Sequence, residues 1–481
     1  MSRLLTAALL SVTALLAGCD GEPVDYSGER YDILLTWAGG NEELDIAAVY
    51  GTPGVAAAAN QPGARRGAAS WQDSAGNFWL FGGQRYETGS DPVKRLHDLW
   101  MYNPGTRLWT WVGGSSELGG TLAHSGKGEY GSLGVAAPGN LPGARMNAVS
   151  WRDANGDFWL FGGEGHDSLG TLGRLNDLWM YDVSAAAWVW VAGSTLADQR
   201  GVYGTRGTAD AANVPGGRHS ASGWIDAAGT LWLFGGSGFD RDGACCLLND
   251  LWTWGGGQWT WVAGSELKDP APVYGTRNTA AAANMPSGRV GAMTWLRTRT
   301  TTDAGTGATT TTETAWLYGG QANTAGGGNI TSAELWKYVP GTGWAWVSGE
   351  QSVFRAGTYE SRGAMSLVAQ PGSRSYATTW TGSDGSLWLF GGSVESTGGA
   401  VINPNDIWRW RDVAWQWEGG KGYDSPGANY KAVGQSGQPG GRSQGSGWLG
   451  SDGKLWLFGG QAGGFDRNDL WFYEPPAATT P

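Results

Sequence analysis

The feature that most constrains the fold is a unit that occurs six times along the chain. Each copy opens with Pro-x-x-Arg, has a Trp six residues after the Arg, and continues into Trp-Leu-Phe-Gly-Gly or a close variant. An acid and a Trp-x-Trp pair follow in most copies. The apolar runs are short, are bounded by Gly, Asp and Asn turn signals, and lack helical length or period. The unit therefore predicts one four-stranded antiparallel sheet per copy.

The Trp content supports a packed structure built from this unit. The chain has 481 residues, of which 41% are hydrophobic and 31 are Trp, so a disordered chain is excluded. Every Trp falls at a strand position of the repeat. We therefore expect the Trp side chains to fill the gaps between neighbouring sheets, rather than to form an exposed binding platform.

Charge argues against a nucleic-acid partner. Asp and Glu number 43 against 32 Lys and Arg, which gives a net charge of -11. A chain with this balance has little to neutralise phosphates, so we predict no nucleic-acid binding.

The repeat resembles the kelch repeat of the galactose-oxidase-like superfamily. The shared pattern is a strand that ends in Gly-Gly, then a Tyr in four copies, then a Trp about seven residues later: the Tyr residues are Tyr102, Tyr181, Tyr338 and Tyr473. The resemblance implies an all-β fold, a six-bladed β-propeller with four antiparallel strands per blade. The expected blades span residues 65–112, 145–191, 218–262, 289–347, 374–417, and 442–473 plus 33–38, within a domain of residues 31–475 that is followed by a tail at 476–481.

Closure of the ring is predicted from the two ends of the repeat region. The sixth copy lacks its Trp-x-Trp strand, while Leu35-Thr36-Trp37 near the N-terminus matches Trp109-Thr110-Trp111 of the first copy. We expect the N-terminal strand to complete the last blade, since pairing the two ends removes open sheet edges.

The N-terminus resembles a bacterial lipoprotein signal. Arg3 precedes a short apolar run, and Leu16-Ala17-Gly18-Cys19 resembles the lipobox. The resemblance implies a signal peptide at 1–18, lipidation of Cys19, a tether at 19–30, and an exported protein held to a membrane of the cell envelope by its N-terminal lipid. Outer membrane, cell surface and inner membrane stay open, because Asp20 resembles a retention signal only in some lineages.

The repeated Arg and the repeated acid predict six structural clamps. The Arg opens the first strand and the acid opens the third, so both lie at one end of a sheet with only Gly-Gly between them. The alternative is a ring of Arg that lines the axis and captures an anion. The expected pairs are Arg65 with Asp98, Arg145 with Asp177, Arg218 with Asp250, Arg289 with Glu334, Arg374 with Asp406, and Arg442 with Asp469.

A ligand site is expected on the face that carries the long loops, near the axis. Loops on a rigid scaffold carry functional variation, and several polar residues there break the sixfold pattern. The candidate ligand-binding residues are Arg66, Gln84, Glu164, His219, Gln321, Tyr376, Gln444 and Gln461. Met146 also departs from the pattern, and His97 replaces an Asn found in four other copies.

Two enzyme families share the expected architecture. Resemblance to the galactose-oxidase type would imply a copper centre whose ligands include two His. This chain has four His and no close pair, so we predict no copper, no other metal and no cofactor. Adjacent Cys245 and Cys246 are either a vicinal disulfide or two thiols. The six-bladed sialic-acid mutarotase needs a carboxylate and an Arg, roles for which Glu164 with Arg66 or Arg85 are candidates.

Together these features favour a lipid-anchored binding module over an enzyme. The expected ligand is a glycan or a protein at the long-loop face. A sugar mutarotase or isomerase is the alternative, and no catalytic residue is assigned.

Overall fold

The computed structural model describes residues 33–86, 93–114, 126–303, 305–324, 326–351, 354–395, 400–422 and 425–476. These residues form antiparallel strands and no helix. The predicted signal peptide, Cys19 and the tether lie outside the described residues. No helix among the described residues is long and apolar enough to cross a membrane.

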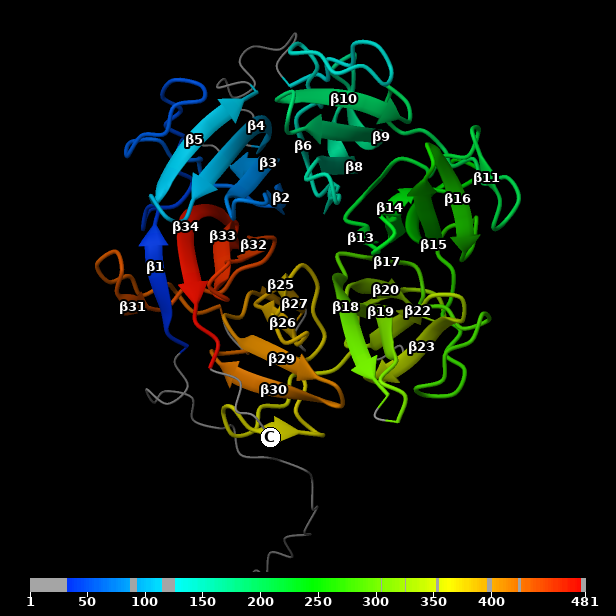
Figure 1. The fold of residues 1–481 in the computed structure, drawn as a ribbon. Helices are drawn as coiled ribbons and strands as arrows, with labels where there is room; N and C mark the ends of the chain where they lie inside the picture. The colour runs from blue at the N-terminus through cyan, green and yellow to red at the C-terminus, as the bar shows by residue number, and fades with distance from the viewer. Residues whose placement is uncertain are drawn as a thin grey trace, which may run out of the picture.

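The strands form sheets set side by side around a common axis (Figure 1), an arrangement consistent with a β-propeller. The first copy of the repeat forms a sheet of β2 (Ala69–Gln72), β3 (Phe78–Tyr86), β4 (Val93–Asn103) and β5 (Leu108–Gly113). The second forms β7 (Val149–Arg152), β8 (Phe158–His166), β9 (Leu172–Asp182) and β10 (Ala187–Ala192), with β6 (Arg145–Met146) paired to β8. The third forms β13 (Ser222–Ile225), β14 (Leu231–Phe239), β15 (Cys245–Gly255) and β16 (Gln258–Ala263), with β11 (Ala209–Asp210) and β12 (Arg218–His219) added.

The remaining copies keep the four-stranded pattern with local additions. The fourth forms β18 (Met293–Thr302), β19 (Thr309–Tyr318), β22 (Leu335–Val339) and β23 (Gly343–Ser348), beside a small sheet of β17 (Arg289–Val290), β20 (Gln321–Asn323) and β21 (Asn329–Thr331). The fifth forms β25 (Thr378–Thr381), β26 (Leu387–Phe390), β29 (Ile407–Arg411) and β30 (Ala414–Gly419), with β24 (Met365–Ser366) and the separate pair β27 (Val394–Glu395) and β28 (Val401–Ile402). The last sheet holds β31 (Ser436–Gly437), β1 (Leu35–Gly39), β34 (Phe465–Tyr473), β33 (Leu455–Ala462) and β32 (Ser446–Leu449), in that order.

The two ends of the described chain meet in this last sheet. β1 pairs antiparallel with β34, with Trp37 opposite Trp471, and Trp111 stands in the same way opposite Trp100 between β5 and β4. The register expected from the match between the two Trp-containing segments is therefore present in the structure.

Buried apolar side chains gather between neighbouring sheets. Each hydrophobic cluster of the described residues draws on two successive copies of the repeat, and one joins the sixth copy to the first. In that cluster Phe78 stacks on Trp448 with ring centroids 5.1 Å apart. The Trp two residues after each acid is fully buried. Burial of these wide rings between sheets follows from their repeated strand positions.

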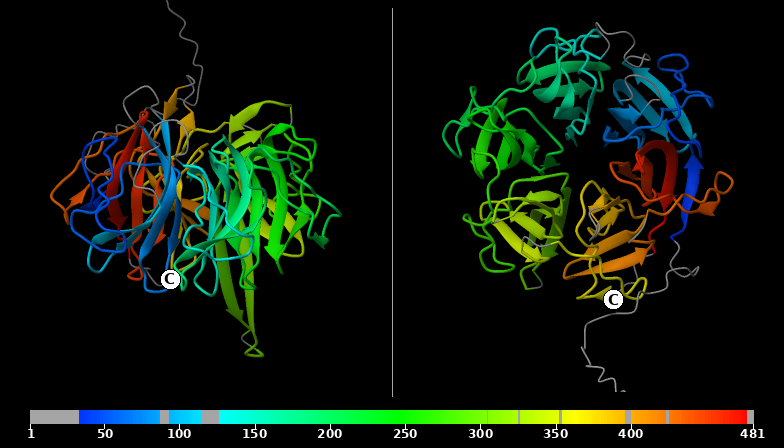
Figure 2. Two further views of the ribbon diagram at one scale, coloured as in Figure 1. Left: turned by 90° about the horizontal axis from the view of Figure 1, so that it is seen from above. Right: turned by 180° about the vertical axis from the view of Figure 1, so that it is seen from behind.

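The Thr-rich insert of the fourth copy lengthens a hairpin. β18 and β19 continue past the neighbouring sheets, and their pairing runs from Met293 opposite Tyr318 to Thr302 opposite Thr309. The hairpin projects from the ring on one side (Figure 2, left). Alternating Thr residues favour such a ribbon because β-branched side chains prefer extended backbone.

Candidate functional site

The repeated Arg and acid contact each other within each copy of the repeat. Every one of these twelve residues is at most 2% exposed. The shortest guanidinium-to-carboxylate distances are 2.7 Å for Arg65–Asp98, 2.7 Å for Arg145–Asp177, 2.6 Å for Arg218–Asp250, 2.9 Å for Arg289–Glu334, 2.8 Å for Arg374–Asp406 and 2.5 Å for Arg442–Asp469. Buried guanidiniums already paired with carboxylates present no N–H group to an anion in solvent, which argues against the anion ring.

The Gly-Gly end of the second strand makes room for this contact. In the first copy the Arg65 Nη1 group donates to the carbonyl of Gly82 at 3.0 Å. A Cβ atom on Gly82 would lie 2.7 Å from the Arg145 carbonyl oxygen, and the residue has a φ of +65°. Only glycine fits here, for both steric and conformational reasons.

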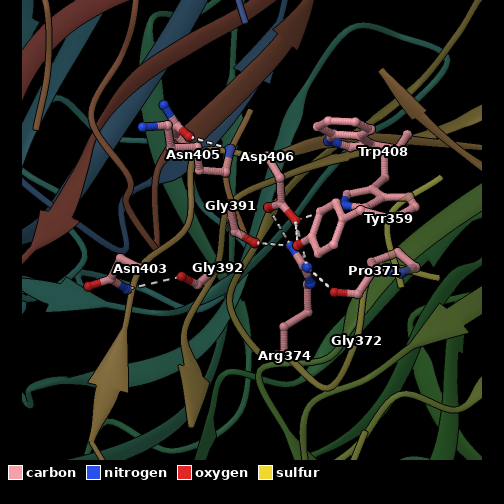
Figure 3. Close-up of polar contacts among 12 residues, drawn as sticks. Tyr359, Pro371, Gly372, Arg374, Gly391, Gly392, Asn403, Asn405, Asp406 and Trp408 are labelled. Atoms are coloured by element: carbon pink, nitrogen blue, oxygen red, sulfur yellow. Dashed lines mark hydrogen bonds and ion pairs between the residues drawn. The ribbon is translucent and has the colours of Figure 1, made fainter. Parts of the chain in front are cut away.

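Two further side chains donate hydrogen bonds to each carboxylate. A Trp two residues after the acid donates its indole N–H, and a Tyr from the preceding long loop donates its hydroxyl. Figure 3 shows the set in the fifth copy, where the Asp406 Oδ2 atom accepts from Tyr359 at 2.7 Å and from Trp408 at 2.7 Å. The Tyr residues are Tyr50, Tyr130, Tyr203, Tyr274, Tyr359 and Tyr430. The first four of these Tyr residues stand in a Tyr-Gly-Thr or Tyr-Gly-Ser segment, which is a sequence signal that could have located them.

The groups around the repeated acid determine its pKa, as Asp98 illustrates. Burial alone raises the pKa of Asp98, but the Arg65 guanidinium and the hydrogen bonds from Arg65, Trp100 and Tyr50 outweigh it, so this pKa lies below its ordinary value. Burial also raises the pKa of Tyr50, which stays protonated. The first clamp therefore holds an ionised Asp98 carboxylate among three donor side chains.

Asn side chains link successive sheets. Asn176 donates to the carbonyl of Pro215 at 3.2 Å and accepts the backbone N–H of Ser194 at 3.1 Å. The same bridge recurs at Asn249, Asn405 and Asn468, the last of which reaches Pro62 in the first copy. His97 takes this position in the first copy; it is 8% exposed, its Nδ1 atom has no partner among the described residues, and burial lowers its pKa to about 4.

Backbone groups two residues after each repeated Arg form a closed cycle of hydrogen bonds. Each N–H donates to the carbonyl of the equivalent residue in the preceding copy, at 2.7 to 3.0 Å. All members have a positive φ: Gly67, Asn147, Ser220, Gly291, Tyr376 and Gln444. They and the residues that follow them line a recess of about 190 Å³, here called the axial recess. One residue from every copy meets here, so the recess lies on the axis of the ring.

Charged residues surround the axial recess on one side. The Glu164 carboxylate contacts the Arg95 guanidinium, which also contacts the Gln84 side chain. The second Glu164 oxygen lies 4.0 Å from His219 Nε2, and His219 Nδ1 lies 3.0 Å from the Ser220 hydroxyl. Burial lowers the pKa of His219 to about 4, and Glu164 raises it back only in part. The imidazole is therefore neutral at pH 7 and able to donate from one nitrogen and accept at the other.

A second pair flanks the same side. Arg66 Nη1 lies 2.9 Å from Asp466, whose other oxygen accepts the Tyr86 backbone N–H at 2.8 Å. Burial raises the pKa of Asp466 to about 6, since Arg66 offsets the effect only partly and Asp45 adds to it. This carboxyl group titrates close to neutral pH.

Tyr376 and Gln444 lie at the centre. The Tyr376 ring covers Gly291, where a Cβ atom would lie 2.6 Å from the ring. The Gln444 amide donates to Asn147 at 3.3 Å across the axis. Burial raises the pKa of Tyr376, so its phenol remains a hydrogen-bond donor.

Of the eight candidate residues, six are gathered around one side of the axial recess. Arg66, Gln84, Glu164 and His219 come from the first three copies and meet Tyr376 and Gln444 there. Gln321 is exposed in β20, and Gln461 is half-buried in β33 opposite Asp466. Among the described residues, neither side chain forms a hydrogen bond with Glu164 or Arg95. Arg174 stands opposite Glu164 in the pairing of β8 with β9. We name the group of Arg66, Gln84, Arg95, Glu164, Arg174, His219, Tyr376, Gln444 and Asp466 the mouth.

Three mouth residues were missed from the sequence. Arg95, Arg174 and Asp466 lie near the start of the third strand of their sheets, where the copies differ in sequence and in hairpin length. No repeated position marks them. Among the described residues, no group of three or more His, Cys, Asp or Glu side chains is arranged to hold a metal ion.

Comparisons with known proteins assign the chain to no family and reveal only distant similarity in structure. No protein-family model matches the chain, and no curated protein matches it in sequence. One similar solved structure is described as YjhT, with 14% identity over 89% of this chain and 98% of that one and a TM-score of 0.49. Another is a fungal alcohol oxidase in complex with copper, with 13% identity over 86% and 74% and a TM-score of 0.43. Neither likeness is close enough to assign an activity to this chain.

Proposed function

We propose that the chain is a six-bladed, kelch-type propeller whose last blade is completed by β1. Three observations support this architecture: the pairing of β1 with β34, the closed cycle of backbone hydrogen bonds, and the cluster that joins the sixth copy to the first. In this proposal the twelve clamp residues have a structural role.

The propeller serves as a binding module, and its ligand binds at the mouth. The observation that carries this is the contrast between neighbouring positions: the clamp is repeated in all six copies, whereas the residue after each clamp Arg varies. Packing demands explain repetition, but they do not explain a neutral His, two Arg–carboxylate contacts and a Tyr gathered on one side of the axis. These groups suit a ligand rich in hydroxyl groups, and we favour a glycan over a protein segment.

A glycan array tests this with the chain from Ser27 onward. Glu164→Gln and His219→Ala should each reduce the signal of a bound glycan at least about tenfold, the effect of losing one hydrogen bond to a charged or buried group. Glu266→Gln is the matched control, because Glu266 contacts Arg241 on the rim. Equal binding by all variants contradicts a site at the mouth, and a protein captured with no glycan signal favours the protein ligand.

Catalysis on a sugar is the second candidate, favoured by one contact. Glu164 and His219 are 4.0 Å apart, close enough to exchange a proton through a bound hydroxyl group. A sugar isomerase or mutarotase would use Glu164 as the acid–base group and Arg66 to orient the substrate. NMR measurement of anomer exchange tests this: a rate above the uncatalysed one that Glu164→Gln abolishes supports the enzyme, and an unchanged rate contradicts it.

Membrane attachment is proposed from the N-terminal sequence. Cys19 carries the lipid, and the propeller is exported to the cell envelope. Mass spectrometry of the mature N-terminus tests this, because a peptide that contains both Gly18 and Cys19 in membrane-derived protein would contradict it.

A further inference from the structure

Cys245 and Cys246 form a pair of thiols beside the mouth. They are the first two residues of β15, opposite Phe239 and Gly238 of β14. Both are free, Cys245 half-buried and Cys246 exposed, and their Sγ atoms are 3.3 Å apart. At this distance the sulfur of one cysteine can attack a disulfide bond formed by the other.

Arg174 connects this pair to the mouth. Its Nη1 group donates to Cys245 Sγ at 2.6 Å and its Nη2 group to Ser237 Oγ at 3.2 Å. The same residue stands opposite Glu164 in the pairing of β8 with β9 and adds to the electrostatic lowering of the His219 pKa. No carboxylate among the described residues forms an ion pair with Arg174, so its guanidinium contacts a thiol, a hydroxyl group and the Phe239 ring, 5.6 Å from the ring centroid.

We propose that Cys245 and Cys246 are a reversible dithiol–disulfide site, and that Arg174 is the positioning residue that couples its oxidation state to the mouth. The oxidant is a small-molecule or protein disulfide. The exposed Cys246 thiol loses its proton to water, and its thiolate attacks one sulfur of that disulfide, which forms a mixed disulfide and releases one thiolate that takes up a proton. Cys245 then loses its proton to water, attacks the Cys246 sulfur and releases the second thiolate. Two protein thiols are oxidised and one external disulfide is reduced to two thiols.

The order of attack follows from the surroundings of the two thiols. Burial raises the pKa of the Cys245 thiol, so Cys246 reacts first. In the second step Arg174 stabilises the thiolate that forms on Cys245, since a cation within hydrogen-bond distance favours the ionised sulfur.

Adjacency makes the bond reversible. Consecutive Cα atoms are about 3.8 Å apart, below the roughly 4.4–6.8 Å spanned by ordinary disulfides, so this bond is strained and readily reduced. The strain falls at the end of the β14–β15 ladder, next to the turn at Asp240. In the oxidised form the Cys245 sulfur is drawn to Cys246, so Arg174 loses this contact, keeps Ser237 and the Phe239 ring, and can shift toward the mouth.

Reaction with oxidised glutathione, followed by mass spectrometry of the intact protein, tests the site. The wild type should lose two hydrogen atoms without keeping an adduct. Cys245→Ser should keep one glutathione, and Cys246→Ser should react far more slowly. Two unreacted thiols in the wild type, or a stable adduct on it as large as that on Cys245→Ser, would overturn the proposal.

The role of Arg174 has its own readouts. Arg174→Met should accumulate the mixed disulfide and slow its resolution roughly fivefold or more, with the rate recovering at higher pH, and Arg174→Lys should restore it in part. Arg241→Met, on the same hairpin, is the control and should resolve like the wild type. The His219 ring signals in NMR should differ between reduced and oxidised wild type and not in Arg174→Met. Identical signals in both wild-type states would refute the coupling, and none of these readouts needs a ligand at the mouth.

Discussion

Asp466 and Asp469 lie three residues apart in β34, and each contacts an arginine, yet their pKa values shift in opposite directions. Burial by itself raises both. At Asp469 the charge and the two N–H donors of Arg442, the charge of Arg467 and the Trp471 indole outweigh burial, and the pKa falls below its ordinary value. At Asp466 the single Arg66 contact and one backbone N–H do not outweigh burial, so the pKa rises to about 6.

This difference distinguishes the clamp carboxylates, which support the fold, from a carboxyl group of the proposed ligand site. A carboxylate that accepts from an Arg, a Tyr and a Trp is fixed in geometry, and this arrangement recurs in all six copies. The buried carboxyl group of Asp466 at the mouth has fewer donors and a raised pKa, so its protonation state can still change near pH 6. Variants in β34 and its partners test this distinction.

Removing β1 should have the largest effect, because it exposes the edge of β34 and the Trp471 ring on which Trp37 packs. We expect a chain that begins at Asn41 to be insoluble or to melt far below one that begins at Ser27. Circular dichroism melts of the two chains measure this. Equal melting temperatures would contradict the closing role of β1.

Breaking the clamp of the same strand should cost about 3–5 kcal/mol for either Arg442→Ala or Asp469→Asn, since each leaves a buried polar partner without its mate. The double variant should be less destabilised than the sum of the two. Urea unfolding provides the free energies. Small and additive effects would show that the buried pair is not a clamp.

The Asp466 carboxyl group should lower the stability of the protein as pH rises, whereas a carboxylate with a lowered pKa, such as Asp469, raises it. The folded pKa of Asp466, about 6, exceeds its unfolded value near 3.8, so the folded state holds a proton that the unfolded state has released between these pH values. Stability therefore falls as pH rises from about 4 to 6. Asp466→Asn removes this loss, and its stability relative to wild type should rise by roughly 1–3 kcal/mol between pH 4 and 7. A constant difference across that range would contradict the raised pKa.

Removing the arginine from the mouth pair should have the smallest effect. Arg66→Ala is expected to cost less than about 1 kcal/mol, because Asp466 can take up a proton once its partner is gone. Unfolding at pH 5 and pH 8 should show the smaller cost at pH 5. A loss at pH 5 as large as that for Arg442→Ala would place Arg66 among the clamps.

Repetition explains what could be predicted from the sequence. Arg218 and Asp250 recur in register with their counterparts, so their contact follows from strand order and the Gly-Gly end. Tyr203 recurs too, but it lies in a long loop, and no strand rule says where its hydroxyl points. The Thr-rich segment of the fourth copy interrupts the repeat, and its ribbon form depends on cross-strand pairing that the repeat does not encode.

The mouth was harder to predict for a physical reason. Arg66 and His219 adjoin the clamp residues, so the repeat register locates them. Arg174 and Asp466 lie near the ends of hairpins that differ in length and sequence, where no repeated position marks a partner. Whether such side chains meet depends on contacts between copies far apart in the chain.

The most direct test is a carbon-13 NMR titration of the Asp466 and Asp469 carboxyl groups in the folded protein. The account predicts that Asp466 titrates near pH 6, while Asp469 stays ionised below the ordinary aspartate range until the protein unfolds in acid. Titration of both groups together near pH 4 would contradict the distinction between a fixed clamp and a titratable mouth.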